Sequence, residues 1–180
     1  MALRDIVKFP DARLRKPTED VREVDAETRA LVEDMVETMY AANGAGIAAI
    51  QVGSQKRIFV VEASVAGGAE NDPPVVFINP KIEWLSEETE TTDEGCLSFP
   101  TIYVPVKRSM SARVRAFDVD GKEFVAEGSA LFARAMQHEN DHLENKLLID
   151  YVGPVKRQMI KRKMERMTDE EADELQAAGE

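Results

Sequence analysis

The chain contains only two histidines, and both lie in the segment QHENDH, Gln137 to His142. Residues four positions apart lie on the same face of an α-helix, so His138 and His142 would point the same way if this segment is helical. Apolar residues precede them at helical spacing: Leu131, Phe132, Ala135 and Met136. The pattern predicts a buried helix that carries both imidazoles on one face, and the rest of the chain has to fold around it.

Two imidazoles placed in this way can bind one divalent metal ion, and Glu139 beside the first can accept a proton from a water held by that ion. A buried helix suits such a site, because metal chemistry works best in a dry cavity. The alternative is that the spacing arises by chance and that each histidine is a core residue with satisfied hydrogen bonds. Metal binding is favoured because both histidines of the chain fall in one motif.

A catalytic metal site needs a third protein ligand, and the chain has no further histidine to supply one. The remaining donors are a downstream carboxylate, such as Glu144 or Asp150, and the only cysteine, Cys96. Cys96 lies in DEGCLSFP, which we expect to be a loop ahead of strands. There it could reach a metal ion, or it could be a small buried hydrophobic residue. The residues alone leave both kinds of ligand open.

The remaining sequence predicts an α+β fold, with short antiparallel strands packed around the central histidine-bearing helix and a further helix near the C-terminus. Asp25 is a candidate N-cap for a first helix, and Gly153-Pro154 a start signal for the last one. Alternating segments around Asp120-Gly121 predict a hairpin. We expect residues 1–168 to form a single domain and residues 169–180 an acidic, frayed tail.

Charge and composition exclude several classes of protein. The net charge of −11 argues against a general affinity for DNA or other nucleic acids, which requires basic surface. A single cysteine allows no internal disulfide and fits a reducing compartment. No stretch approaches the roughly 20 apolar residues of a membrane helix, and the charged start does not resemble a secretory signal. We therefore expect a cytoplasmic protein with neither a membrane nor DNA as partner.

Three segments resemble the motifs of one enzyme family. GAGIAAIQ (44–51), EGCLS (94–98) and QHENDH (137–142) are similar, in the same order, to the motifs GxGxAAxQ, EGCxS and QHExDH of the peptide deformylases. The arm KFPDARLRKP, the INP after a strand and the ending DYVGPVKRQMIKRK are similar as well. The resemblance is to the bacterial type, covers nearly the whole chain and implies the deformylase fold around a metal-binding helix.

That resemblance implies a metal ion held by Cys96, His138 and His142. The implied native ion is Fe²⁺, and the softness of a thiolate with two imidazoles also allows Zn²⁺, Ni²⁺ or Co²⁺. The implied reaction is hydrolysis of the N-formyl group from the N-terminal methionine of newly synthesised polypeptides, with release of formate.

The resemblance also implies roles for the neighbouring residues. Glu139 would act as the general base, and the side-chain amide of Gln51 with the backbone N–H of Leu97 would stabilise the developing oxyanion. Gln51 taken alone could equally cap a backbone carbonyl. Gly44 and Gly46 are either turn residues that need a positive φ or points of close backbone approach, where the substrate peptide pairs as an added strand.

An apolar pocket must hold the methionine side chain, and each candidate for it could also be plain core: Ala45, Ile47, Leu131 and Ala135. Glu94 of EGCLS is expected to be structural and to orient its loop or a neighbour such as Arg108 or Arg134. Two positions depart from the family pattern. Asn145 replaces a glycine after the metal helix, where asparagine tolerates the left-handed conformation, and Tyr103 stands where many members carry an arginine that contacts the peptide.

Two other functions remain open. One is a different metallopeptidase or amidase, which would use a carboxylate as third ligand and leave EGCLS without a role. The other is a non-enzymatic binding module with a structural metal, which would require a closed site of four ligands. The basic stretch from Lys156 to Arg166 is either a solvated helix face or, in a deformylase that meets nascent chains, a contact to ribosomal RNA.

Overall fold

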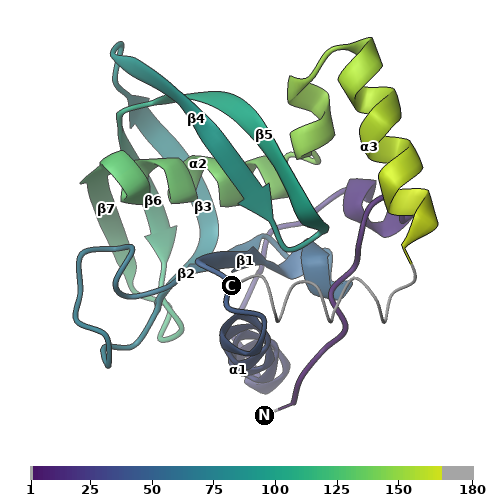
Figure 1. The fold of residues 1–180 in the computed structure, drawn as a ribbon. Helices are drawn as coiled ribbons and strands as arrows, with labels where there is room; N and C mark the ends of the chain where they lie inside the picture. Colours follow the sequence, from purple (N-terminus) through teal and green to yellow (C-terminus); the bar gives the residue numbers. More distant parts are fainter. Residues whose placement is uncertain (1, 168–180) are drawn as a thin grey trace.

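A computed structural model describes residues 2–167 of the chain. Its helices and strands form an α+β arrangement, in which six strands follow one another along the chain before the second α-helix (Figure 1). The helical segments are η1 (Ala12–Arg15), α1 (Ala26–Ala41), η2 (Ala49–Val52), α2 (Ala130–Leu143), η3 (Leu148–Tyr151) and α3 (Pro154–Arg166). The strands are β1 (Gly46–Ala48), β2 (Ile58–Val61), β3 (Val75–Leu85), β4 (Thr89–Cys96), β5 (Phe99–Ser109), β6 (Ser111–Phe117) and β7 (Glu123–Ser129).

The strands form two antiparallel sheets with α2 between them. Five strands are ordered β1-β2-β3-β6-β7, and β4 pairs with β5 in a separate hairpin. Figure 1 shows α2 crossing between the five-stranded sheet and this hairpin, with α1 and α3 at the periphery. The predicted fold class is therefore confirmed, including the central helix and the helix near the C-terminus.

Helix α2 is amphipathic, as its spacing predicted. Ala133, Met136 and Leu143 pack on the sheet together with a cluster of buried apolar residues: Ala48, Ile50, Phe59, Val61, Phe77, Ala112, Val114 and Ala116. The same helix also buries Gln137, Glu139 and His142. The apolar contacts fix the helix against the sheet, and this anchoring determines the direction in which its polar residues point.

The other face of strands β1 and β2 packs against α1. Ile47, Ile58 and Val60 contact Leu31 and Met35 in a second cluster. Asp25 caps α1 as predicted, because its side chain accepts a hydrogen bond from the Thr28 amide at 2.8 Å. Successive strand residues point to opposite faces, so this short sheet region contributes to two cores, one on α2 and one on α1.

A third apolar cluster joins the β4–β5 hairpin to the C-terminal part of the chain. Phe99, Val104 and Val106 of β5 pack with Ile160 and Met164 of α3, and with residues of the N-terminal arm and η3. The last helix begins at Pro154 with Gly153 as N-cap, as predicted. The predicted tail at 169–180 lies outside the described residues.

Two further details follow the sequence expectations. The turn between β6 and β7 contains Asp120 and Gly121, the latter at φ +77°. Asn145 has φ +59° after α2, so it adopts the left-handed conformation for which glycine is usual. None of the helices in residues 2–167 combines the length and apolar character required to cross a membrane.

One expectation was wrong. Cys96 does not lie in a loop; it is the last residue of β4 and pairs with Phe99 of β5. Strand β4, TETTDEGC, is exposed along most of its length and carries polar residues on both faces. It therefore lacks the alternation of apolar and polar residues by which a half-buried strand is recognised in a sequence. Its pairing with β5 identifies it as a strand.

Candidate metal centre

Three potential metal ligands converge where β4 ends beside α2. The sulfur of Cys96 and one ring nitrogen each of His138 and His142 all lie within 4.8 Å of one another. Cys96 Sγ is 3.4 Å from His142 Nε2, and the two imidazole rings meet edge to face with centroids 5.2 Å apart. The hairpin supplies the thiol and the helix supplies both imidazoles, so packing of α2 against β4–β5 assembles the cluster.

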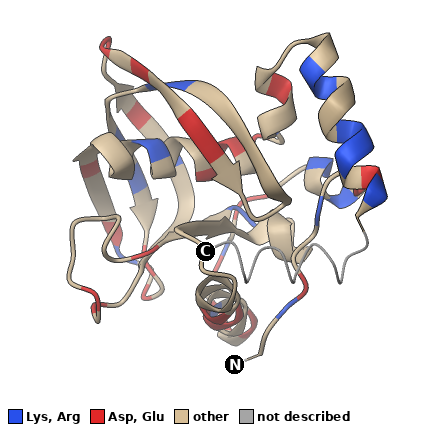
Figure 2. Ribbon diagram, viewed as in Figure 1, with Lys and Arg blue, Asp and Glu red and all other residues tan. Residues whose placement is uncertain are grey.

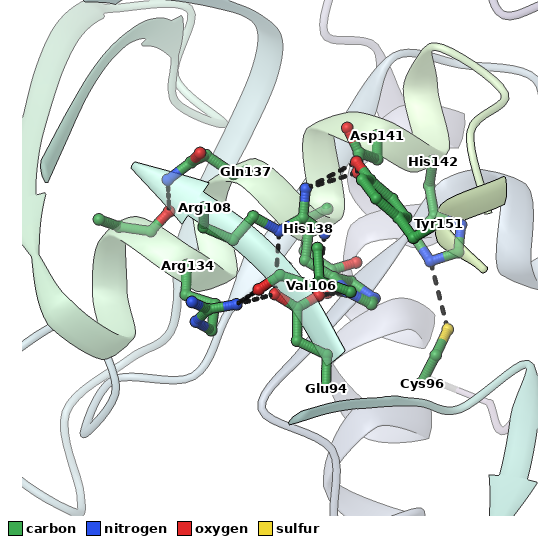
Figure 3. Close-up of polar contacts among 12 residues, drawn as sticks. Glu94, Cys96, Val106, Arg108, Arg134, Gln137, His138, Asp141, His142 and Tyr151 are labelled. Carbon is green, nitrogen blue, oxygen red and sulfur yellow. Dashed lines mark hydrogen bonds and ion pairs between the residues drawn. The ribbon is translucent and has the colours of Figure 1, made fainter. Parts of the chain in front are cut away.

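The orientation of the His138 ring is fixed by Glu94, on the side away from the other two ligands. Its Nδ1 lies 2.9 Å from Glu94 Oε1, which leaves Nε2 toward Cys96 and His142 (Figure 3). A histidine that binds a metal through one nitrogen usually has the other held by such a carboxylate. Nδ1 of His142 is buried and has no hydrogen-bond partner among residues 2–167. One thiol and two imidazoles, each with an available donor atom, fit a divalent metal ion of the zinc or iron type.

The two imidazoles differ in their affinity for a proton. Burial opposes the charged form of His138, but the Cys96 thiol and the carboxylates of Glu94 and Glu139 outweigh it and raise its pKa well above the usual value. Burial and the neighbouring His138 lower the pKa of His142 well below its usual value. A proton and a metal ion would therefore compete at His138 and not at His142.

Glu139 is a buried carboxyl group, and few hydrogen bonds offset the cost of its burial. Burial raises its pKa to about 7, and its Oε1 has no hydrogen-bond partner in the described part of the chain. Its Oε2 lies 4.0 Å from His138 Nε2. A carboxylate with a pKa near neutrality is suited to accept a proton and to return it within one reaction cycle.

Gln51 is held with its amide nitrogen toward the thiol. Its Oε1 accepts a hydrogen bond from the Ala48 amide at 2.9 Å, and its Nε2 donates to Ser98 Oγ at 3.1 Å and lies 3.5 Å from Cys96 Sγ. The Ser98 hydroxyl in turn donates to the Val7 carbonyl at 2.7 Å. The side chain therefore caps a backbone N–H and not a carbonyl, and this bond presents its NH₂ group to the centre.

Two of the three ligands, Cys96 and His138, line an open cavity of about 300 Å³, and His142 is not among its lining residues. Most of the predicted site residues line it: Gly44, Ala45, Gly46, Gln51, Cys96, Leu97, Leu131, Ala135, His138 and Glu139. Ile47 is not on the described cavity wall, because it is fully buried in the cluster on α1. Alternation along β1 explains this placement, since Gly46 and Ala48 face α2 and Ile47 faces the opposite side.

Gly44 and Gly46 serve close packing and not a positive φ. A Cβ on Gly44 would come within 2.8 Å of Leu97 Cδ1, and one on Gly46 within 2.8 Å of Glu139 Oε2. The left-handed residue of this turn is Asn43, at φ +56°. The expected positive φ at these glycines was therefore wrong, and tight packing against Leu97 and Glu139 accounts for them. The approach of a substrate backbone to this segment stays a prediction.

Apart from Tyr103, sequence reasoning missed the part of the cavity wall that β5 supplies: Phe99, Thr101 and Ile102. Their proximity to EGCLS in the sequence was the available signal. Tyr103 is 53% exposed at the cavity, and its ring covers Gly95, where a Cβ would approach Tyr103 Cε1 to 2.9 Å. An exposed aromatic ring therefore stands where many deformylases were expected to carry an arginine.

Comparisons with known proteins place these features in a family. The family model described as polypeptide deformylase matches residues 3–158. The peptide deformylase of Teredinibacter turnerae is 47% identical over 172 residues, which cover 96% of this chain and 100% of that protein. The peptide deformylase of Saccharophagus degradans is 48% identical over 166 residues, 92% of this chain and 94% of that protein.

Solved structures agree with the sequence comparisons. The peptide deformylase of Ehrlichia chaffeensis superposes with a TM-score of 0.85 at 36% identity, over 92% of this chain and 96% of that one. A structure of the Ehrlichia chaffeensis enzyme in complex with actinonin superposes with a TM-score of 0.86 at 37% identity, over 93% of this chain and 100% of that one. The chain therefore belongs to the peptide deformylase family, whose members are metal-dependent hydrolases that remove the N-formyl group from the N-terminal methionine of new polypeptides.

Proposed function

We propose that this chain hydrolyses N-formylmethionyl peptides at the centre formed by Cys96, His138 and His142, with Glu139 as the general base. The observation that carries the proposal is the convergence of the three ligand atoms within 4.8 Å, beside a cavity that Cys96, His138 and Glu139 line. When bound there, a divalent metal ion supplies Lewis-acid chemistry, lowering the pKa of water and polarising a carbonyl oxygen.

Glu139 accepts the proton of the attacking water and later delivers it to the leaving amine. Its raised pKa, about 7, suits both steps, because the group gains and loses a proton near neutral pH. The amide nitrogen of Gln51 and the backbone N–H of Leu97 stabilise the negative charge that develops on the formyl oxygen. The bond from the Ala48 amide to Gln51 Oε1 supports this role, since it holds the donor in place before the reaction.

The substrate is proposed to pair as an added strand with the segment from Gly44 to Gly46, which lines the cavity beside the ligands. Ala45, Leu131 and Ala135 line the pocket for the methionine side chain, and Ile47 supports it from the core. An extended peptide would leave the cavity past Tyr103, which is exposed at the cavity wall.

Fe²⁺ is the proposed native ion, with Zn²⁺, Ni²⁺ or Co²⁺ as substitutes, because a thiolate with two imidazoles suits each of them. Residues 1–168 are proposed to form one catalytic domain. The proposed location is the cytoplasm, where new polypeptides begin with formylmethionine. The exposed basic side chains of α3 are proposed to contact the ribosome, so that the enzyme meets its substrate as it emerges.

The test measures formate release from a short formylmethionyl peptide, using protein purified without oxygen and with its bound metal quantified in the same sample. Formate production is expected to scale with iron content. Glu139→Gln should abolish formate release while metal content and fold persist, and Cys96→Ser should strip or disable the metal. Fully metal-loaded wild-type protein that releases no formate would contradict the proposal. A Cys96→Ser variant that keeps its metal and its activity would contradict Cys96 as the third ligand and would indicate a carboxylate in its place.

A further inference from the structure

A buried set of charged side chains lies directly behind the metal ligands (Figure 3). At its centre, Glu94 accepts hydrogen bonds from Arg108 Nε and Nη2, both at 2.9 Å, and from Arg134 Nη1 at 2.5 Å. The remaining partner of this carboxylate is His138 Nδ1 at 2.9 Å. The side chains of Glu94 and Arg108 are each only 5% exposed, so a shift of one has to move the other.

Arg108 extends this set to a residue outside the three site motifs. Its Nη1 donates to Asp141 Oδ2 at 2.6 Å and to the Tyr151 hydroxyl at 3.0 Å. The same hydroxyl donates to Asp141 Oδ2 at 2.5 Å. The polar contacts therefore form a closed triangle of Arg108, Asp141 and Tyr151, which joins η3 to helix α2 next to His142.

Tyr151 is itself held firmly. Its neighbour Asp150 accepts two hydrogen bonds from the Arg15 guanidinium, at 2.9 Å each, and one from the Leu147 amide at 2.9 Å. The aromatic ring of Tyr151 lies 4.3 Å from Lys146 Nζ and 5.0 Å from Arg108 Cζ, both measured to the ring centroid. Cation–π contacts of this kind add to the hydrogen bonds in fixing the ring.

The charges of this set balance. Two guanidinium groups, Arg108 and Arg134, face two carboxylates, Glu94 and Asp141. Removing one partner from a buried ionic group leaves a charge that the interior cannot solvate, so the remaining groups have to move.

We propose that Tyr151 is a positioning residue for the metal centre: its hydroxyl fixes Arg108, Arg108 fixes Glu94, and Glu94 holds His138 with Nε2 toward the metal ion. The inference rests on the proposed function, because it assigns His138 as a ligand. It extends the site by a residue of η3 that neither touches the substrate nor lines the cavity.

Tyr151→Phe tests the inference, because it keeps the ring and removes only the hydroxyl. Arg108 then loses one acceptor and Asp141 one donor. Removing a group that supports a metal-bound histidine weakens metal binding by about 10–100-fold. Tyr151 acts two contacts further away, so we expect a smaller change, roughly a fivefold faster release of bound Ni²⁺ or Zn²⁺ to a chelator. The value of kcat should fall with it, and KM for the formyl peptide should stay unchanged.

Tyr40→Phe is the matched control, since Tyr40 is 43% exposed and lies outside the charged set. It should release the metal at the wild-type rate. A double variant identifies the route: Tyr151→Phe combined with Arg108→Lys should release metal no faster than Arg108→Lys alone, because the two changes act along one path. If Arg108→Lys does not fold, Asp141→Asn takes its place in the same comparison.

Equal metal release from Tyr151→Phe and wild-type protein would overturn the inference, even if the melting temperature of the variant falls, because the hydroxyl would then be merely structural. A double variant whose rate of metal release rises by the product of the two single-variant effects would also contradict the inference. Failure of the proposed function looks different: metal-loaded wild-type protein would release no formate, while the comparison of metal release would still give a result.

Discussion

At the scale of single residues, the centre depends on one carboxyl group that is kept in an unfavourable place. Glu139 is 5% exposed, its Oε1 has no partner among residues 2–167, and burial raises its pKa to about 7. A protein that needed only stability would carry a neutral residue here. The raised pKa of this group supports its proposed role as a proton acceptor.

This placement predicts that the metal-free Glu139→Gln variant becomes more stable than the metal-free wild-type protein as the pH rises. The folded-state pKa lies above the ordinary value of 4.5, so the favourable contribution of protonated Glu139 is complete below pH 4.5 and lost as the pH passes 7. The glutamine stays neutral throughout. Its advantage in the free energy of unfolding should grow from near zero at pH 4.5 to about 2–3 kcal/mol at pH 8. Urea unfolding with a chelator present measures it.

Glu33→Gln is the control for that comparison, because Glu33 is exposed on α1. It should change the free energy of unfolding by only a few tenths of a kcal/mol at either pH. A Glu139→Gln variant with the same advantage at pH 4.5 and pH 8 would show that the effect comes from packing and not from ionisation.

At the scale of helices and strands, β1 and α2 approach each other closely in the site. Gly46 leaves room for Glu139, and a Cβ there would lie 2.8 Å from Glu139 Oε2 and 3.1 Å from Glu139 Cδ. Gly46→Ala should therefore displace the base without unfolding the sheet. A displacement of about 1 Å can reduce a rate roughly a hundredfold, and we expect a loss of that order in formate release at unchanged metal content.

Gly153→Ala is the matched change, since a Cβ on Gly153 meets nothing within 4 Å and its φ of −75° is ordinary for any residue. It should keep the wild-type rate. A Gly46→Ala variant as active as wild type would mean that Glu139 accommodates the methyl group, and it would contradict the explanation of this glycine by close packing.

The sequence predicted the elements whose signals are local. The period of apolar residues located α2, Asp25 located the start of α1, and the turn at Asp120-Gly121 located the β6–β7 hairpin. It did not predict the β4–β5 hairpin, because β4 is polar on both faces and is defined by its partner. It did predict that Glu94 meets Arg108 or Arg134, and the structure shows both contacts. It could not predict that Arg108 also meets Asp141 and Tyr151, since those contacts join positions 33 and 43 residues apart.

At the scale of the whole molecule, charge is distributed unevenly over an acidic protein. The net charge is −11, yet helix α3 carries six basic residues and one acidic residue, and Figure 2 shows blue concentrated along it. Its two buried residues, Ile160 and Met164, anchor it to the third cluster, while the basic side chains from Lys156 to Arg166 are exposed. An anchored basic helix on an acidic body can direct the protein toward a polyanion in one orientation.

This asymmetry predicts that charge reversal on α3 reduces co-sedimentation with ribosomes. Lys156→Glu combined with Lys161→Glu changes the net charge by four units and removes two exposed cations. Binding to nucleic acid phosphates weakens as such contacts are lost, and so does its dependence on salt.

The control variant, Lys81→Glu with Lys122→Glu, makes the same change in net charge at exposed positions of the β3–β6–β7 region. The α3 variant should lose co-sedimentation while the control keeps it, and both should hydrolyse a short formyl peptide at the wild-type rate. Equal loss in the two variants would show that total charge, and not α3, governs the association.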